Sequence, residues 1–315
     1  MESGKVIEIT PEEQRKIQLL QLNILKEFDR ICRKHDLKYT LAGGSMLGAV
    51  RHKGFIPWDD DVDVSMLREE YEKFCEICKT ELDAEKYFLQ TMDTDPEYRF
   101  IYGRILLNGT AYVRAGQEHM KAKNGIFIDI FPRDGFSDNF IIGWFQSKLG
   151  LLMRKTLYSP VGKYRSRNKV SKVVFAFLSF LPRDFIVFLN KLIQKLNFSK
   201  NTERVCCYGL MGDKEKKKLD LGRKAYRAYK RNQKNESKKD RLERKDREKG
   251  LKRVFFEEII ELPFEDMSTM VTAYYDIWLK TNYDDYMKLP PVNKRVIHQT
   301  VSYYCLGEYD KIVEK

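Results

Sequence analysis

The spacing of hydrophobic residues predicts a helix near the start of the chain, followed by a short strand. Thr10-Pro11-Glu12-Glu13 has the form of a capping box with proline at the first helical position. The helix continues to about His35, with one apolar face made of Ile17, Leu20, Ile24, Phe28 and Ile31. Residues Lys38 to Ala42 then read as a short strand that ends in a glycine-rich turn.

Helices and strands remain mixed along the following hundred residues. Arg68 to Leu82 has the pattern of an amphipathic helix. Tyr87 to Met92, Arg99 to Leu107 and Gly125 to Pro132 are expected to be strands, and a helix is expected from about Ser268 to Lys280. The pattern is typical of an α+β protein.

Asp129 is the single acid within the apolar strand Gly125 to Pro132. A carboxylate inside a buried strand costs several kcal/mol unless it is paired or bound to a metal. Asp129 could cap a turn near Pro132, or it could be a metal ligand beside other acids. We favour the metal ligand.

Residues 40 to 66 contain two features that differ in chemistry. Gly43-Gly44-Ser45 has no β-carbon at its first two positions, so a phosphate could approach the backbone, and a helix that starts at Ser45 would add an anion site. Four aspartates then lie within the six residues Asp59 to Val64. In a strand, Asp61 and Asp63 would share one face, and two adjacent carboxylates favour Mg²⁺ or Mn²⁺ between them.

Each feature has a simpler interpretation when it is taken alone. A Gly-Gly-Ser turn is usually only a turn, and a cluster of aspartates is usually a solvated loop. Because both occur within one short stretch, we interpret them as a phosphate cradle followed by a divalent-metal strand. This layout is typical of phosphoryl or nucleotidyl transfer.

Charge is placed unevenly along the 315 residues. Of the net charge of +12, residues 213 to 253 carry +11, from 19 Lys or Arg and 8 Asp or Glu. This segment has few apolar residues, so we expect a solvated insertion, with attraction to anionic lipid as the alternative. The rest of the chain is close to neutral, and we therefore expect no nucleic-acid partner. The six cysteines show no disulfide framework, and with no signal peptide recognised the protein is expected to be cytoplasmic.

The region 138 to 212 is apolar and dotted with basic residues. Phe140 to Met153 and Val170 to Phe198 contain many Phe, Leu and Ile side chains. Val173 to Pro182 is uncharged, but a helix that crosses a bilayer needs about 20 such residues. Two interpretations stay open: ordinary core helices, or a basic amphipathic patch in peripheral contact with the inner face of the plasma membrane.

The stretch that contains these motifs resembles the LicD family, whose members share a nucleotidyltransferase-type fold with the fukutin proteins. The matching residues are Gly43-Gly44-Ser45, Leu47-Gly48, Arg51, Gly54 and the run Ile56 to Asp63. The element around Asp129 and the tail from Asn282 to His298 are also similar, although Asp284 stands where the family usually has glycine. The resemblance implies a nucleotidyltransferase-like mixed sheet flanked by helices, with an added helical region and a charged insertion. The expected parts are a catalytic core (1–137), a helical region (138–212), the insertion (213–253) and a C-terminal part that returns to the core (254–315).

The resemblance also implies a reaction. Family members move phosphocholine, or another phospho-alditol, from a CDP-linked donor to a hydroxyl of a surface glycan, with release of CMP. We expect Asp61, Asp63 and Asp129 to hold the metal ions. The expected binding residues for the donor are Gly43, Gly44, Ser45, Arg51, Lys53 and Arg104. Two other classes stay open: a nucleotidyltransferase that acts on a small molecule and releases pyrophosphate, and a non-catalytic scaffold.

Overall fold

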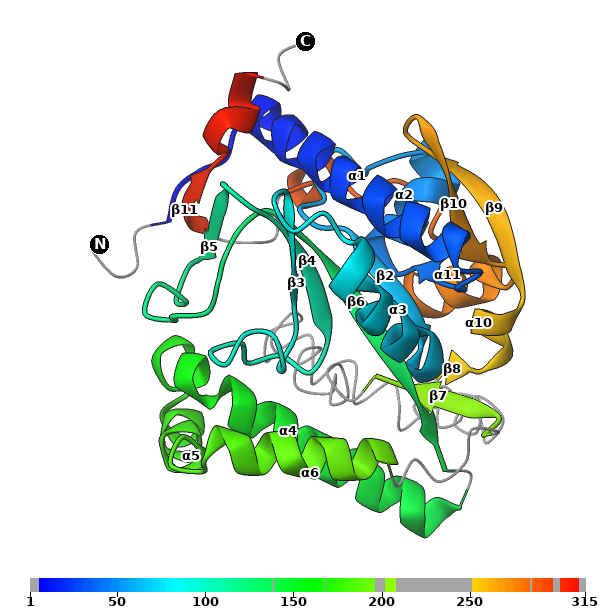
Figure 1. The fold of residues 1–315 in the computed structure, drawn as a ribbon. Coiled ribbons are helices and arrows are strands. Elements are labelled where there is room, and N and C mark those ends of the chain that lie inside the picture. Colours follow the sequence, from blue (N-terminus) through cyan, green and yellow to red (C-terminus); the bar gives the residue numbers. More distant parts are fainter. Residues whose placement is uncertain are drawn as a thin grey trace.

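The computed structural model describes residues 6–137, 139–166, 168–195, 202–207, 251–283, 285–296 and 301–311 (Figure 1). Most of the charged insertion expected at 213–253 lies outside these ranges, as do Asp284 and His298. The expectations for those residues therefore stay predictions.

A mixed sheet forms the centre of the fold (Figure 1). Its strands run in the order β1 (Thr40–Leu41), β2 (Asp63–Leu67), β6 (Phe127–Phe136), β4 (Gly103–Leu107) and β3 (Tyr87–Gln90). Strands β2 and β6 are parallel, whereas the other neighbours in this order are antiparallel. The far half of β6 pairs with β7 (Arg204–Cys206), which in turn pairs with β8 (Leu251–Lys252). All ten residues of β6 are buried, so this strand lies at the centre of the fold.

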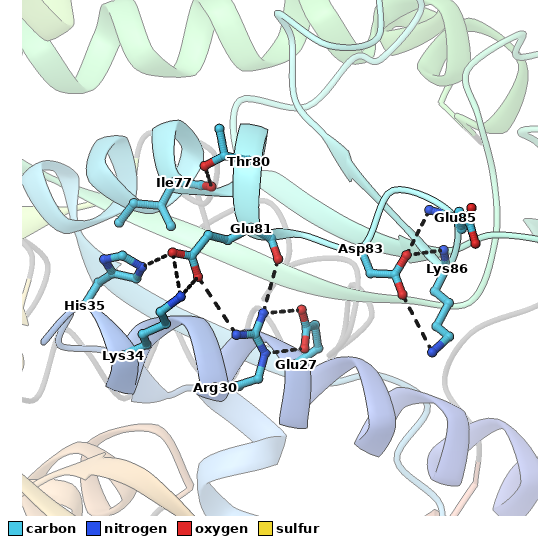
Figure 2. Close-up of polar contacts among 10 residues, drawn as sticks. All are labelled: Glu27, Arg30, Lys34, His35, Ile77, Thr80, Glu81, Asp83, Glu85 and Lys86. Carbon is cyan, nitrogen blue, oxygen red and sulfur yellow. Dashed lines mark hydrogen bonds and ion pairs between the residues drawn. The ribbon is translucent and has the colours of Figure 1, made fainter.

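Helices α1 (Pro11–Lys34) and α3 (Arg68–Glu81) lie side by side against the sheet and share its main hydrophobic core. The capping box at Thr10 is present, and the predicted apolar face of α1 is fully buried. Figure 2 shows how the ends of the two helices are joined: Lys34 and His35 of α1 both contact the Glu81 carboxylate, at 2.9 and 2.7 Å. These ion pairs are exposed, so the buried core supplies most of the stability of this contact.

The C-terminal part differs from the prediction in one element, the helix expected from Ser268 to Lys280. Residues Ser268 to Lys280 do not form one helix: β9 (Ile259–Phe264) and β10 (Met267–Thr272) form a hairpin, and α11 spans Tyr275–Tyr283. The reason is visible in β10, where Thr269 and Val271 are buried, whereas Ser268 and Met270, which precede them, are more exposed. The hairpin lies against β1, where the Thr272 amide donates to Thr40 Oγ1 at 2.9 Å.

Smaller elements close the other side of the molecule. Strand β5 (Ala111–Arg114) pairs with β11 (Val301–Cys305), and the Tyr304 hydroxyl donates to Glu13 of α1. The short elements α10 (Val254–Glu257), η1 (Val292–Lys294) and η2 (Gly307–Lys311) complete the C-terminal part. The chain's last described segment thus packs on its first helix.

Three helices form a separate layer at one end of the sheet (Figure 1): α4 (Phe140–Arg165), α5 (Lys169–Leu178) and α6 (Arg183–Lys195). Large apolar side chains are exposed on this layer, among them Phe177 (73%) and Phe180 (84%). Within the described residues, no single helix has the length and apolarity to cross a bilayer, and the one combination that meets both criteria is Lys169–Leu178 with Arg183–Leu192, bent by 83°.

The predicted fold class is confirmed, because a curled mixed sheet with helices packed on it is an α+β architecture. Within 138–212, the region expected to be helical, the structure describes α4, α5 and α6, and also β7, which extends the sheet. The expected division into parts stays a prediction.

Candidate active site

Two acids predicted to share a metal site lie side by side on the central strands. Asp63 of β2 and Asp129 of β6 are direct partners in the parallel pairing. Asp61 completes the group, and one carboxylate oxygen from each of the three residues lies within 4.8 Å of the others. Residues that are far apart in the sequence therefore lie close together in the fold, and their carboxylates form one group at the sheet.

The acidic strand is shorter than predicted. Strand β2 begins at Asp63, so Asp61 lies in the segment that leads into it and reaches the group from a loop. This loop adds Asp59 and Asp60, whose carboxylates form a second close group with Asp61. Burial and the negative charges of Asp61, Asp129 and Asp59 raise the pKa of Asp63 well above its ordinary value. Burial and the charges of Asp61 and Asp60 do the same to the pKa of Asp59.

Three buried glutamines of α1 hold the acidic loop in place. Gln14 and Gln18 donate their side-chain amides to the Asp59 carbonyl, at 2.8 and 3.0 Å. Gln18 also donates to the Ile56 carbonyl, and Gln21 donates to the Asp60 carbonyl. Because these residues are three and four apart, they lie on one face of the helix. These glutamines were not predicted from the sequence, although their helical spacing beside the apolar residues of this face was the available signal.

The glycine turn positions the acids as well as the helix that follows it. Helix α2 (Gly43–His52) begins two residues earlier than predicted, with Ala42 as its N-cap. Gly43 has a φ of +52°, a left-handed conformation that glycine adopts without strain. A Cβ on Gly44 would lie 2.2 Å from Asp59 Oδ2, and Ser45 Oγ accepts a hydrogen bond from the Asp63 amide at 2.9 Å. In this structure, the turn therefore contacts the acidic cluster directly.

Arg51 and Lys53 lie at the other end of α2. The Arg51 guanidinium donates to the Tyr286 carbonyl at 2.7 Å, which links α2 to the C-terminal tail. Lys53 is the left-handed C-cap residue of α2, its carbonyl accepts from the Glu265 amide, and its side chain is exposed. The roles predicted for both residues toward the donor nucleotide stay predictions.

Two arginines border the acidic cluster. Arg104 of β4 is the pairing partner of Asp129 and forms a buried ion pair with it, Nε to Oδ1 at 2.5 Å. Arg114 of β5 lies with its Nη2 3.6 Å from Asp61 Oδ2. Both guanidinium groups lie over the ring of Phe127, at 4.1 and 4.8 Å. Arg114 was not predicted, because nothing in the sequence connects β5 with the acidic loop.

Tyr283, near the end of α11, brings the C-terminal tail to the site. A Cβ on Gly43 would lie 3.9 Å from its hydroxyl. Partial burial and the charges of Asp59, Asp63 and Asp61 raise the pKa of Tyr283, so the hydroxyl stays protonated and can donate a hydrogen bond.

Comparison with known proteins agrees with this geometry. Residues 36–170 match the family described as LicD/FKTN/FKRP, nucleotidyltransferase domain. The chain is 31% identical over 295 residues to the lipopolysaccharide cholinephosphotransferase LicD of Haemophilus influenzae, an alignment that covers 93% of this chain and 98% of that protein. The chain belongs to the LicD family. It is also 27% identical over 196 residues to an uncharacterized protein of Rickettsia typhi, which covers 59% of this chain and 56% of that one.

The LicD-family match contains the glycine turn, the acidic loop and Asp129, so the close group of acids falls within the nucleotidyltransferase domain. The atoms that this group of acids offers to a metal are all carboxylate oxygens, the donor type that suits Mg²⁺ or Mn²⁺. The raised pKa of Asp63 fits the same interpretation, since a divalent cation would relieve the repulsion that raises it. The residues therefore fit a divalent metal.

Proposed function

We propose that this LicD-family protein transfers a phospho-head group, with phosphocholine as the first candidate, from a CDP-linked donor to a hydroxyl of a cell-surface glycan and releases CMP. The observation that supports the proposal is the register of Asp63 against Asp129, which brings two carboxylates and Asp61 within 4.8 Å. The named activity of the Haemophilus relative is the reason to place phosphocholine first.

In this proposal Asp61, Asp63 and Asp129 would hold Mg²⁺ or Mn²⁺. The bound ion supplies charge neutralisation for the transferring phosphoryl group and for the attacking and leaving oxygens. The chain's own residues do the rest. The glutamines of α1 fix the backbone of the acidic loop, and Ser45 fixes the amide of Asp63. Arg114 supplies positive charge beside the carboxylates, and Tyr283 offers a hydroxyl donor from the tail.

The test is an assay of leaving groups. Purified protein is incubated with CDP-choline, CDP-glycerol, CDP-ribitol or a nucleoside triphosphate, each with Mg²⁺, with Mn²⁺ or with EDTA. We expect metal-dependent CMP release in the presence of a glycan acceptor, fastest with CDP-choline. Asp63→Asn should abolish it, whereas Asp266→Asn, which changes an exposed acid paired with Lys26, should not.

Each alternative has its own signature in this assay. Pyrophosphate release from a nucleoside triphosphate would support a nucleotidyltransferase that acts on a small molecule. A preference for CDP-glycerol or CDP-ribitol would keep the phosphotransferase and change the head group. No metal-dependent turnover of any donor would contradict the proposal as a whole.

We also propose that the protein works in peripheral contact with the inner face of the plasma membrane, where a lipid-linked glycan acceptor would be anchored. The support is the exposed apolar stripe of α5, made of Val170, Val173, Val174 and Phe177, together with Phe180 in the turn that follows. Lys169 and Lys172 are exposed on the same helix and suit an anionic lipid surface.

Flotation with anionic liposomes tests the contact. Because Phe177 and Phe180 are exposed, replacing both with glutamate should leave the fold intact and prevent flotation. Val292→Glu is the matched control, since Val292 is also exposed (76%) but belongs to η1. Wild-type protein that stays off the liposomes at low salt would end this proposal.

A further inference from the structure

A cavity of about 140 Å³ lies beside the acidic cluster and is not part of it. Strands β4 and β5, the segment before β4 and the segment 117–125 supply most of its walls, and Tyr158 of α4 also lines it. Arg104 and Arg114 line the cavity and also contact Asp129 and Asp61. The two guanidinium groups therefore form the boundary between the cavity and the carboxylates.

The cavity has hydrogen-bonding capacity that the protein itself does not use. Two tyrosine hydroxyls, of Tyr98 and Tyr112, are buried and have no hydrogen-bond partner among the described residues. The same holds for Nε of Arg99 and for Nε of Arg114. All four side chains line this cavity. Buried polar groups without partners are costly, so a place where several of them meet is suited to a ligand.

The charge of the lining indicates what kind of ligand fits. The cavity is lined by four cationic side chains and one carboxylate: Arg99, Arg104, Arg114, Lys123 and Glu118. Asp129 and Asp61 pair with Arg104 and Arg114, so Arg99 and Lys123 supply the excess of positive charge over Glu118 in the lining. A quaternary ammonium such as choline would be repelled here, although aromatic rings are present. Guanidinium and phenol donors suit the oxygens of a phosphate and of neighbouring hydroxyls.

We propose that this cavity binds a phosphate-bearing part of a substrate next to the acidic cluster. Two sources share this chemistry: the nucleotide of the donor, and a sugar phosphate of the acceptor. The two sources are taken from the proposed phosphotransfer, so the identity of the ligand rests on the proposed function. The binding of a phosphate in this cavity does not depend on it. The choline head group binds elsewhere.

The experiment uses the full chain and measures binding by titration calorimetry, with and without Mg²⁺. The probes are inorganic phosphate, CMP, glucose 6-phosphate and choline chloride. The variants are Tyr98→Phe and Tyr112→Phe, which remove the unpartnered hydroxyl and keep the ring. Each should weaken binding of the preferred phosphate probe about threefold to tenfold. Each should leave the melting temperature of the ligand-free protein unchanged or higher, because a buried polar group without a partner is lost.

Tyr39→Phe is the matched control. Its hydroxyl is also buried, but it donates to Asp29 at 2.8 Å and lies outside the cavity. This variant should melt at a lower temperature and bind the probes like the wild type. Effects of the cavity variants on CMP identify the donor as the source, and effects on glucose 6-phosphate alone identify the acceptor.

Three results would overturn the inference: no phosphate probe binds, choline competes with the phosphate that binds, or the cavity variants bind like the wild type. Turnover separates this failure from that of the proposed function. If the wild type releases CMP from CDP-choline and both cavity variants bind and turn over normally, the reaction stands and the cavity has no part in it.

Discussion

Replacing Arg104 with methionine would show whether Asp129 is shared between an arginine and a metal ion. Arg104 and Asp129 form a buried ion pair in which both side chains have little exposed surface. Methionine fills a similar volume without charge, so the change leaves the buried Asp129 carboxylate beside Asp63 without its ion-pair partner. Breaking a buried pair from one side costs about 3–5 kcal/mol. For a chain of 315 residues, that corresponds to a decrease in melting temperature of about 5–8 °C in EDTA.

Divalent metal should reverse part of this loss. Removing a positive charge from hydrogen-bonding distance of a ligand carboxylate should tighten metal binding by at least about tenfold, or about 1.4 kcal/mol. The rise in melting temperature when Mg²⁺ is added should then be larger in the variant than in the wild type, by about 2 °C. The assay is thermal unfolding followed by circular dichroism, over a Mg²⁺ series that starts from EDTA.

Arg68→Met is the control for this experiment. Arg68 forms a buried pair with Asp134, with contacts of 2.8 and 2.9 Å, at the other end of β6. It should lose comparable stability and respond to Mg²⁺ like the wild type. An equal Mg²⁺ response in the two variants would refute the assignment of Asp129 as a metal ligand. If Arg104→Met does not fold, Arg104→Lys provides a smaller perturbation with the same expected order.

Three further changes test other parts of the site. Asp63→Asn should abolish turnover and raise the stability of the metal-free protein at pH 7. Because folding raises the pKa of Asp63, this gain in stability should shrink as the pH falls toward the ordinary pKa of 3.8. Denaturation at several pH values measures it. Gln18→Leu removes the hydrogen bonds from Gln18 to the Ile56 and Asp59 carbonyls, each of which keeps one other donor. At about 0.5–1.5 kcal/mol per bond, it should lower the free energy of unfolding by about 1–3 kcal/mol in urea titrations, with a larger loss of turnover than a leucine-for-isoleucine change at Ile24. Gly44→Ala places a Cβ against the Asp59 carboxylate and should reduce kcat more than it reduces stability; an equal loss of both would mean that the glycine only shapes the turn.

The acidic pair was predictable because its signal is local. Apolar residues surround both Asp63 and Asp129, so each acid reads as an exception within a buried strand, and repulsion between such acids points to a cation. The sequence could not supply the register that makes them direct neighbours. It also could not place Arg114, which reaches the cluster from a strand that pairs with β11 outside the main sheet.

Other differences arise where one pattern fits two structures. The residues from Met267 to Thr272 are compatible with helical spacing, but Thr269, Val271 and Thr272 are β-branched or small, and pairing with β9 decides for a strand. Likewise, the glycines at 43 and 44 were predicted to leave space near the backbone for a phosphate. In the structure a carboxylate of the protein itself lies in the space beside Gly44.

The contacts between the N-terminal elements and the C-terminal segments determine when the protein can fold during its synthesis. The edge strand β1 receives its hydrogen bond from Thr272, which is 232 residues further along the chain, and Glu13 receives its bond from Tyr304, 291 residues away. At ribosomal rates of about 5–20 residues per second, β1 and β2 are synthesised on the order of 10 s before β10. During that interval the nascent sheet has an uncovered edge next to its acids. Folding should therefore finish only after these C-terminal segments have been synthesised, and their loss should produce aggregation rather than a smaller active protein.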